Sequence, residues 1–227
     1  MLRKNIKLPK YMVHKGYAKE YPENTLDSIK EAKNRSALWV EIDIQILKDG
    51  TPVVFHDDEF NGKKIAEYLN YFDFCKQNFS LNGYSYKPPT LNQALATCFD
   101  LKLGINLDLK QSVFGYENNV IQIIRNYTFP LLLSSFYPSI LENCSKINNG
   151  LFIGILFDEI PNDWKTIACQ IGVDSIHANH LHLNDILIDE IKNSNYPLVA
   201  YTINIKIICD NLFQKGIDCI ITDEIFD

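Results

Sequence analysis

Long apolar runs are absent from this sequence of 227 residues, and their absence narrows the kind of protein it encodes. No stretch approaches the roughly 20 apolar residues that a membrane-spanning helix needs. The basic start, residues 1–10, holds no apolar run long enough for a signal peptide before His14. We therefore expect a soluble protein that is neither inserted in a membrane nor secreted.

An excess of positive charge is also missing, since 28 acidic residues outnumber 22 basic ones and give a net charge of −6. Proteins that bind nucleic acids or membrane surfaces usually carry a basic face. The charge balance argues against both classes. An anionic small-molecule substrate would need positively charged side chains placed locally around it.

Close-paired cysteines, which would suggest a metal site, are missing too. Most of the six cysteines fall in apolar surroundings, which favours reduced core thiols and a cytoplasmic location. Internal repeats, low-complexity tracts and flexible linkers are absent. Because 46% of the residues are hydrophobic and 12% are aromatic, the chain can bury a sizeable core, and we expect one domain over residues 1–227.

The sequence does contain short apolar runs that alternate with segments of helical spacing, as is typical of βα units. Eight such runs predict the parallel strands of a single (β/α)8 TIM barrel, in the α/β class. The expected strands are Tyr11–Gly16, Trp39–Ile46, Ile105–Lys110, Leu131–Phe136, Phe152–Phe157, Asp174–Asn179, Leu198–Asn204 and Cys219–Asp223. The expected helices are Thr25–Asn34, one starting at Pro89-Thr90, Glu117–Asn126, Pro138–Ile147, Asn162–Ile171, Asp185–Asn193 and Ile205–Gln214. We expect Asn24 or Thr25 to cap the first helix.

One further β run, Pro52–His56, follows the second strand after a connection that is too short for a parallel crossover. We predict a β-hairpin above the barrel mouth, with His56 carried back over the end where barrel active sites lie. Residues 58–89 are expected to form an irregular insertion at the same end.

Acidic side chains recur on two of the expected strands. Glu41 and Asp43 are separated by one residue, so they point to the same side of their strand. Asp108 and Lys110 repeat this spacing on the next barrel strand. Like charges so close together need a cation, and three carboxylates suit Mg²⁺ or Ca²⁺. A solvated strand edge would show the same pattern, so the pattern alone leaves both interpretations open.

Two histidines from distant parts of the sequence end β runs: His14 closes the first strand and His56 closes the hairpin, so their rings could face each other. Histidine titrates near neutral pH, so one can take a proton from an attacking hydroxyl group while the other gives a proton to the departing alkoxide. A single histidine is more often structural. The combination with three carboxylates favours acid–base catalysis.

These residues belong to an ordered set of short motifs that covers nearly the whole chain. Its members are His14-Lys15-Gly16, Pro22-Glu23-Asn24-Thr25, Glu41-Ile42-Asp43, Asp49-Gly50, His56-Asp57, Pro89-Thr90-Leu91, Asn106-Leu107-Asp108-Leu109-Lys110, Ser135-Phe136, Tyr201-Thr202-Ile203-Asn204 and Thr222-Asp223. In order and spacing, this set resembles the signature of the glycerophosphodiester phosphodiesterase family.

The resemblance implies a barrel fold and a reaction in two stages. In the mechanism that the family suggests, the glycerol hydroxyl next to the phosphate attacks first, and water then opens the cyclic phosphate to release glycerol 3-phosphate and an alcohol. The implied roles are acid–base catalysis by His14 and His56, neutralisation of the phosphate by Lys15 and Lys110, and binding of a divalent metal ion by Glu41, Asp43 and Asp108.

Two positions depart from the family pattern. Lys15 stands where the family usually has arginine, and its ammonium group lacks the planar fork that grips two phosphate oxygens. Asp108 stands where the family usually has glutamate, and its side chain is one methylene shorter. The first departure predicts a weaker grip on the substrate, and the second predicts a changed metal affinity or preference.

Two other groups of residues have less specific patterns. Phe136 and Tyr201, at strand ends, are expected either to contact the glycerol or alcohol part of the substrate or to pack against their neighbours. His177, His180 and His182 favour a loop cluster at the barrel mouth over a zinc site, because no matching carboxylate or cysteine motif accompanies them.

Three functions remain open at this point. The first is hydrolysis of small glycerophosphodiesters such as glycerophosphocholine. The second applies the same chemistry to lipid headgroups, as in lysophospholipase D or sphingomyelinase D relatives of the barrel, and would need an apolar acyl groove or a membrane-facing loop. The third is a barrel that binds phosphodiesters without cleaving them, which the two histidines disfavour. The sequence leaves the released alcohol, the metal ion and the oligomeric state undetermined.

Overall fold

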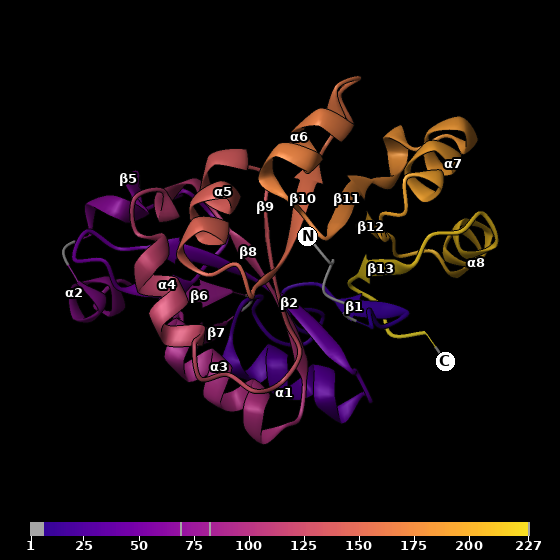
Figure 1. The fold of residues 1–227 in the computed structure, drawn as a ribbon. Coiled ribbons are helices and arrows are strands. Elements are labelled where there is room, and N and C mark those ends of the chain that lie inside the picture. The colour runs from indigo at the N-terminus through magenta and orange to yellow at the C-terminus, as the bar shows by residue number, and fades with distance from the viewer. Residues whose placement is uncertain (1–6, 69, 82, 227) are drawn as a thin grey trace.

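The computed structural model describes residues 7–68, 70–81 and 83–226. Its barrel strands are β1 (Tyr11–Val13), β2 (Trp39–Ile46), β8 (Gly104–Leu109), β9 (Leu131–Ser135), β10 (Phe152–Phe157), β11 (Ser175–Asn179), β12 (Leu198–Tyr201) and β13 (Cys219–Thr222). All neighbours in this set pair in parallel, and the barrel closes because β1 pairs with both β13 and β2. The predicted eight-stranded barrel is therefore confirmed (Figure 1).

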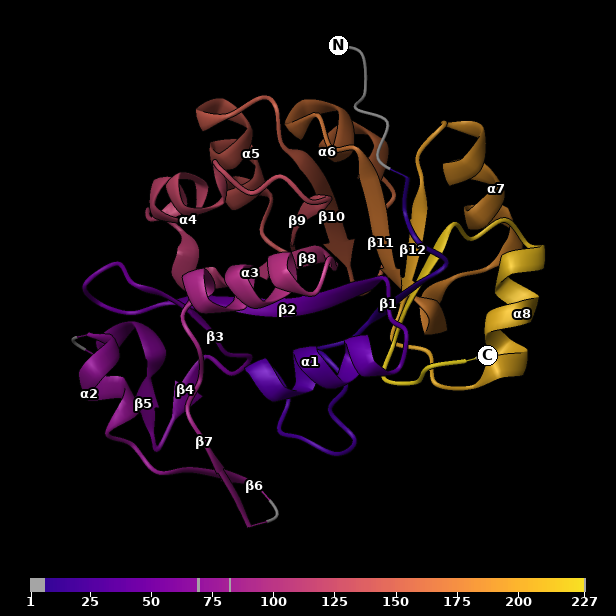
Figure 2. The same cartoon turned by 90° about the horizontal axis from the view of Figure 1, so that it is seen from below.

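Helices follow the strands and cover the outside of the barrel, as Figure 2 shows. The outer helices are α1 (Leu26–Asn34), α3 (Leu91–Asp100), α4 (Glu117–Ile124), α5 (Pro138–Ile147), α6 (Trp164–Ile171), α7 (Asp185–Asn193) and α8 (Lys206–Gln214). Short 3₁₀ turns lie at η1 (Ile65–Glu67), η2 (Gln111–Val113) and η3 (His180–His182). None of the helices in the described residues is long and apolar enough to span a membrane.

The start of α1 explains part of the Pro22-Glu23-Asn24-Thr25 motif. The Thr25 hydroxyl accepts a hydrogen bond from the Ser28 N–H at 3.1 Å, and the Ser28 hydroxyl accepts one from the Thr25 N–H at 3.2 Å. This reciprocal pair satisfies two backbone donors that the first helical turn leaves open. Thr25 is therefore the capping residue, and Asn24 is available for another contact.

Side chains along β2 alternate between two environments. Val40, Ile42 and Ile44 belong to the main hydrophobic cluster, which includes the buried faces of the outer helices. Trp39 belongs instead to a smaller cluster contributed by several strands, which forms the apolar floor of the barrel. Because successive residues of a strand face opposite ways, Glu41 lies on the same face as Trp39, closer to the carboxyl end of β2.

Gly104 at the start of β8 makes room for this floor. A Cβ atom at position 104 would lie 2.3–2.6 Å from three atoms of the Trp39 indole ring. Trp39 and Gly104 are direct neighbours in the β2–β8 register. The missing side chain of the glycine thus lets the large indole ring fill the barrel beneath the polar residues.

The hairpin arm β3 (Pro52–Val54) pairs antiparallel with β2, as predicted. The insertion of residues 58–89 is not irregular, contrary to the prediction. It contains the small hairpins β4 (Glu59–Phe60) with β5 (Lys63–Lys64) and β6 (Phe79–Leu81) with β7 (Tyr84–Tyr86), and the helix α2 (Tyr71–Cys75).

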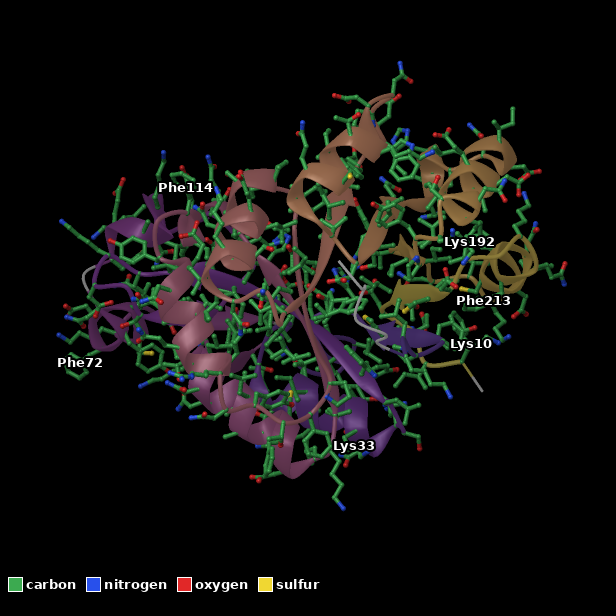
Figure 3. All side chains as sticks on the ribbon, in the orientation of Figure 1. Lys10, Lys33, Phe72, Phe114, Lys192 and Phe213 are labelled. Carbon is green, nitrogen blue, oxygen red and sulfur yellow. The ribbon has the colours of Figure 1, made fainter. Side chains whose placement is uncertain are left out.

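Aromatic packing gives the insertion this order. Phe55, Phe74 and Phe79 are buried in a separate cluster, and Phe60 stacks on Phe79 with ring centroids 4.3 Å apart. Phe72 points away from the barrel at the outer edge of α2 (Figure 3). The aromatic residues of this segment therefore hold the insertion together and anchor it to the β2–β3 hairpin.

Candidate active site

The carboxyl ends of the barrel strands surround a cavity of about 200 Å³. Its walls bring together every site residue predicted from the sequence except Lys15. The lining residues are His14, Glu41, Asp43, His56, Asn106, Asp108, Lys110, Ser134, Phe136, Leu156, Tyr201, Thr202 and Ile221.

Glu41, Asp43 and Asp108 form one buried acidic cluster in this cavity. One oxygen from each carboxylate lies within 4.8 Å of the other two. Asp43 and Asp108 lie side by side because β2 and β8 pair in register at these residues. Burial, together with the charge of Asp43, raises the pKa of Glu41 to about 8, because a further negative charge in this buried cluster is unfavourable without a cation.

The donor set fits a hard divalent ion. Carboxylate oxygens are the ligands that Mg²⁺ and Ca²⁺ prefer, and the cluster contains no sulfur or nitrogen donor. The Oδ1 atom of Asp108 is buried and has no hydrogen-bond partner among the described residues. A buried carboxylate oxygen without a donor is costly, and coordination to a cation would satisfy it.

Lys110 bridges two members of the acidic cluster. Its Nζ lies 2.7 Å from Asp43 Oδ1 and 2.6 Å from Asp108 Oδ2. Burial alone would raise the pKa of Asp43, but the charge of Lys110 outweighs this effect and holds that pKa below its ordinary value. Burial would likewise lower the pKa of Lys110, and the charges of Asp108 and Asp43 raise it instead. Lys110 is therefore a charged ammonium group inside the cluster.

Asn24 holds Asp43 from both sides, a role that the sequence did not reveal. Its Nδ2 donates to Asp43 Oδ2 at 2.7 Å, and its Oδ1 accepts from the Asp43 N–H at 3.0 Å. The backbone of Asn24 has a φ of 59°, which asparagine tolerates better than most residues. Thr25 alone caps α1, so the Pro22-Glu23-Asn24-Thr25 motif contains an asparagine that the cap does not need. That asparagine is the sequence feature that could have indicated a role in the site.

His14 is held by polar residues that follow the last two strands. Its Nδ1 lies 2.7 Å from Asp223 Oδ1, and Asp223 Oδ2 accepts from Asn204 Nδ2 at 2.7 Å. Burial alone would lower the pKa of His14, but the hydrogen bond with Asp223 and the charges of Glu41 and Asp223 outweigh it and raise the pKa. A carboxylate at Nδ1 favours a proton there, which leaves Nε2 free to exchange a proton with a ligand.

The sequence pattern predicts no role for either Asp223 or Asn204. Both stand in short motifs that resemble the family, Thr222-Asp223 and Tyr201-Thr202-Ile203-Asn204. A polar residue directly after a barrel strand was the signal that could have pointed to them.

His56 has a carboxylate at the same ring position. Its Nδ1 lies 2.8 Å from Asp57 Oδ1, and its side chain is 43% exposed. Gln45, fully buried in β2, fixes the backbone, because its Nε2 donates to the carbonyl oxygens of His56 at 3.1 Å and of Asp57 at 3.0 Å. His14 and His56 thus line one cavity, each with a carboxylate at Nδ1.

Lys15 differs most from its predicted place. Its Nζ pairs with Glu23 at 3.0 Å, and the side chain is largely buried. Its backbone N–H donates to Glu41 Oε2 at 3.0 Å, in a backbone conformation with a φ of 55°. Lys15 therefore contacts the acidic cluster through its backbone, while Glu23 neutralises its ammonium group beside the cavity.

Phe136 and Tyr201 form an aromatic wall of the cavity. Their rings meet edge to face with centroids 6.1 Å apart, and the Tyr201 hydroxyl donates to the Phe157 carbonyl at 2.8 Å. Phe136 remains 40% exposed. With Leu156 beside it, this wall suits the carbon skeleton of a ligand better than its charged groups.

The three histidines near β11 do not form a metal site. The acidic cluster is the only group of three or more potential metal-ligating side chains found in the described part of the chain. His180 and His182 lie in η3, as a loop cluster predicts. His177 is buried inside the barrel, contrary to that prediction, because strand alternation turns its ring toward Ser175 and into the space beside Gly154.

Comparisons with known proteins find relatives of this chain in both sequence and fold. A glycerophosphodiester phosphodiesterase from Caldanaerobacter subterraneus subsp. tengcongensis is 26% identical to this chain over 94% of its length and 93% of the relative. The structure of a phosphodiesterase from Oleispira antarctica in complex with its product sn-glycerol-3-phosphate matches with a TM-score of 0.87 at 25% identity, covering 95% of this chain and 93% of the other.

The fold also recurs in a glycerophosphodiester phosphodiesterase from Thermotoga maritima, with a TM-score of 0.77 at 24% identity and coverage of 97% of this chain and 96% of the other. The model of the glycerophosphoryl diester phosphodiesterase family matches residues 14–226. A match that runs from the first histidine of the cavity almost to the last residue shows that this chain belongs to the glycerophosphoryl diester phosphodiesterase family.

Proposed function

We propose that this protein hydrolyses glycerophosphodiesters to glycerol 3-phosphate and a free alcohol. The observation that carries the proposal is one cavity lined by two histidines, each with a carboxylate at Nδ1, beside a buried acidic cluster and a lysine. These groups supply what the displacement at phosphorus requires, namely proton transfer at both ends and stabilisation of the phosphoryl oxygens. The glycerol 3-phosphate complex of the Oleispira relative supports the same product here.

In this proposal Glu41, Asp43 and Asp108 hold a divalent metal ion, either Mg²⁺ or Ca²⁺. The bound ion would act as a Lewis acid that stabilises negative charge on the phosphoryl oxygens. Asn24 orients the Asp43 carboxylate, and the Lys15 N–H orients that of Glu41. Such supporting contacts hold ligands in place for a cation.

The two histidines perform the proton transfers. One Nε2 accepts the proton of the glycerol hydroxyl next to the phosphate, and the other histidine protonates the departing alcohol, which leaves a cyclic phosphate. In the second stage the roles reverse: the histidine that protonated the alcohol takes a proton from an attacking water molecule, and the other returns its proton to the glycerol oxygen as its bond to phosphorus breaks. Asp223 and Asp57 stabilise whichever ring carries two protons.

The remaining residues of the site would bind the substrate, the lysines through its phosphate and the aromatic residues through its carbon skeleton. Lys110, which lines the cavity, would contact the phosphate directly, whereas Lys15 would add positive potential from its pair with Glu23. Phe136 and Tyr201 would pack against the carbon skeleton of the substrate.

The test is a coupled assay for release of glycerol 3-phosphate from a panel of glycerophosphodiesters and lysolipids, with and without divalent ions. We expect His14→Ala and His56→Ala each to lower turnover by about a hundredfold or more, since a positioned acid or base typically contributes 10²–10⁴-fold. Circular dichroism would check folding. A loss of less than about tenfold in both variants would remove the acid–base assignment.

We also propose a cytoplasmic location, supported by the six cysteines, all of which are free thiols in the structure. Cell fractionation tests this, and recovery of the protein in a secreted fraction with oxidised thiols would contradict it.

A further inference from the structure

Lys110 occupies an unusual place for a phosphate-binding lysine. Its Nζ lies 2.7 Å from Asp43 Oδ1 and 2.6 Å from Asp108 Oδ2, so it sits between two of the three carboxylates of the acidic cluster. Its side chain is only 14% exposed, and those of Asp43 and Asp108 are 2% and 7% exposed. Solvent therefore screens these contacts weakly.

The Lys110 ammonium group and the other donors around Asp43 and Asp108 leave limited room for a metal ion as a second cation. Asp43 Oδ1 accepts from Lys110 and its Oδ2 accepts from Asn24 Nδ2. Asp108 Oδ2 also accepts from Lys110, and only its Oδ1 lacks a partner among the described residues. A divalent ion held by these carboxylates would lie close to an ammonium group of the same sign.

We propose that Lys110 is a built-in competitor for the divalent cation, with which it shares Asp43 and Asp108. The inference rests on the proposed function. Binding of the ion weakens the ion pairs of Lys110 and makes its ammonium group available to a phosphate. Lys110 thereby lowers the metal affinity of the cluster and couples metal binding to phosphate binding.

Isothermal titration calorimetry with Mg²⁺ and with Ca²⁺, after removal of metal by EDTA, tests the competition directly. Lys110→Met keeps the length of the side chain without its charge, and we expect it to bind at least one of the ions about tenfold or more tightly than the wild type. Lys110→Arg retains the charge and should stay near the wild type. Lys206→Met is the matched control, because it changes the net charge equally but removes only the exposed pair with Asp210 on α8.

Unchanged or weaker binding of both ions by folded Lys110→Met would overturn the proposal, since the lysine would then position the carboxylates without competing. If that variant does not fold, labelling of the wild-type protein with an amine-reactive reagent decides the question, with modified lysines located by mass spectrometry. We expect saturating Mg²⁺ or Ca²⁺ to raise the labelling rate of Lys110 several-fold relative to Lys206. If the labelling rate of Lys110 is the same with and without either ion, metal binding does not release Lys110 from Asp43 and Asp108, and the proposal fails.

These measurements need no substrate, so their results can reject the competition without rejecting the proposed function, and the reverse. Under the proposal, Lys110→Met combines tighter metal binding with a loss of glycerol 3-phosphate release. If the wild type cleaves no member of the panel while Lys110→Met still binds metal more tightly, the competition stands and the proposed function fails.

Discussion

Asp223 determines the orientation of His14 from the other end of the chain. The two residues are 209 positions apart, and their hydrogen bond of 2.7 Å forms only because β1 and β13 lie side by side. Asn204 fixes the other carboxylate oxygen of Asp223, so the imidazole ring has little freedom to turn. Asp223 therefore acts through His14 as a positioning residue.

We predict that Asp223→Asn lowers kcat about tenfold or more, because an amide can no longer stabilise the doubly protonated ring. KM should change little. Steady-state kinetics would measure both, and Asp223→Glu should restore part of the loss. Asp210→Asn is the control, since it removes a carboxylate that pairs with Lys206 on α8. Equal activity of Asp223→Asn and the wild type would show that His14 needs no positioning.

His177 links residue chemistry to the stability of the fold. Its ring is fully buried, and burial lowers its pKa to about 3, well below the value of about 6.5 for a histidine in an unfolded chain. Between these two values the unfolded state binds a proton that the folded state excludes. The free energy of unfolding must therefore fall as the pH drops below about 6.5. At higher pH neither state binds this proton, so His177 no longer makes the stability depend on pH.

We predict that His177 accounts for a loss on the order of 1–2 kcal/mol between pH 7 and pH 5. Urea denaturation at both pH values would compare the wild type with His177→Asn. The variant should be less stable at pH 7, because a smaller side chain leaves a cavity, but its stability should change less with pH. An identical pH dependence in the two proteins would contradict the prediction.

At the scale of elements, the loop between β1 and α1 depends on one close approach. Gly16 has a φ of 70°, and a Cβ atom there would lie 2.8 Å from the Ser28 carbonyl carbon and 2.9 Å from the Ile29 nitrogen. These are backbone atoms of α1 and cannot move aside as a flexible side chain would. The helix therefore packs directly on the loop that carries His14 and Lys15.

We expect Gly16→Ala to lower the free energy of unfolding by about 1–3 kcal/mol through this overlap, in addition to backbone strain. Gly115→Ala is a matched control, because Gly115 has a φ of 85° and a Cβ atom there would have no neighbour within 4 Å. Chemical denaturation of both variants isolates the packing contribution. If both variants lose the same free energy of unfolding, the close approach of α1 to Gly16 does not contribute to the destabilisation.

The ends of the strands show where local pattern stops being informative. Periodicity extended the first strand to Gly16 and the seventh to Asn204, whereas β1 ends at Val13 and β12 at Tyr201. The chain leaves the sheet at these points because the following polar groups bond to other elements, as Asn204 does to Asp223. By contrast, β2 has the predicted bounds, since all of its residues are buried in the barrel.

For the whole molecule, we expect the acidic cluster to make the free energy of unfolding depend on a bound cation. Glu41, Asp43 and Asp108 come from two strands that the barrel holds in register, so their charges cannot separate without disturbing the sheet. An ion that binds only the folded state shifts the folding equilibrium toward it. The expectation of a single domain over residues 1–227 remains a prediction, and one cooperative transition would support it.

We predict that Mg²⁺ or Ca²⁺ at a hundredfold excess over its measured Kd adds about 2.7 kcal/mol to the stability of EDTA-treated protein. For a chain of this length the melting temperature should rise by roughly 5–10 °C. Scanning calorimetry would measure the shift, which should be smaller at the same concentration in Asp108→Ala. No shift with either ion would contradict the three-carboxylate site.

The sequence alone predicted the order of the barrel elements and the family, because hydrophobic periodicity and motif spacing are properties of the chain. It also predicted that Glu41 and Asp43 share one face, since alternation along a strand is local geometry. Which polar groups pair around the cavity depends on the folded chain, and local pattern does not predict it. Lys110 reaches Asp43, and His14 reaches Asp223, because barrel closure and register bring distant strand ends together. The pair of the Lys15 ammonium group with Glu23 has a more local origin, because the fold of the β1–α1 loop sets that distance and sequence spacing does not.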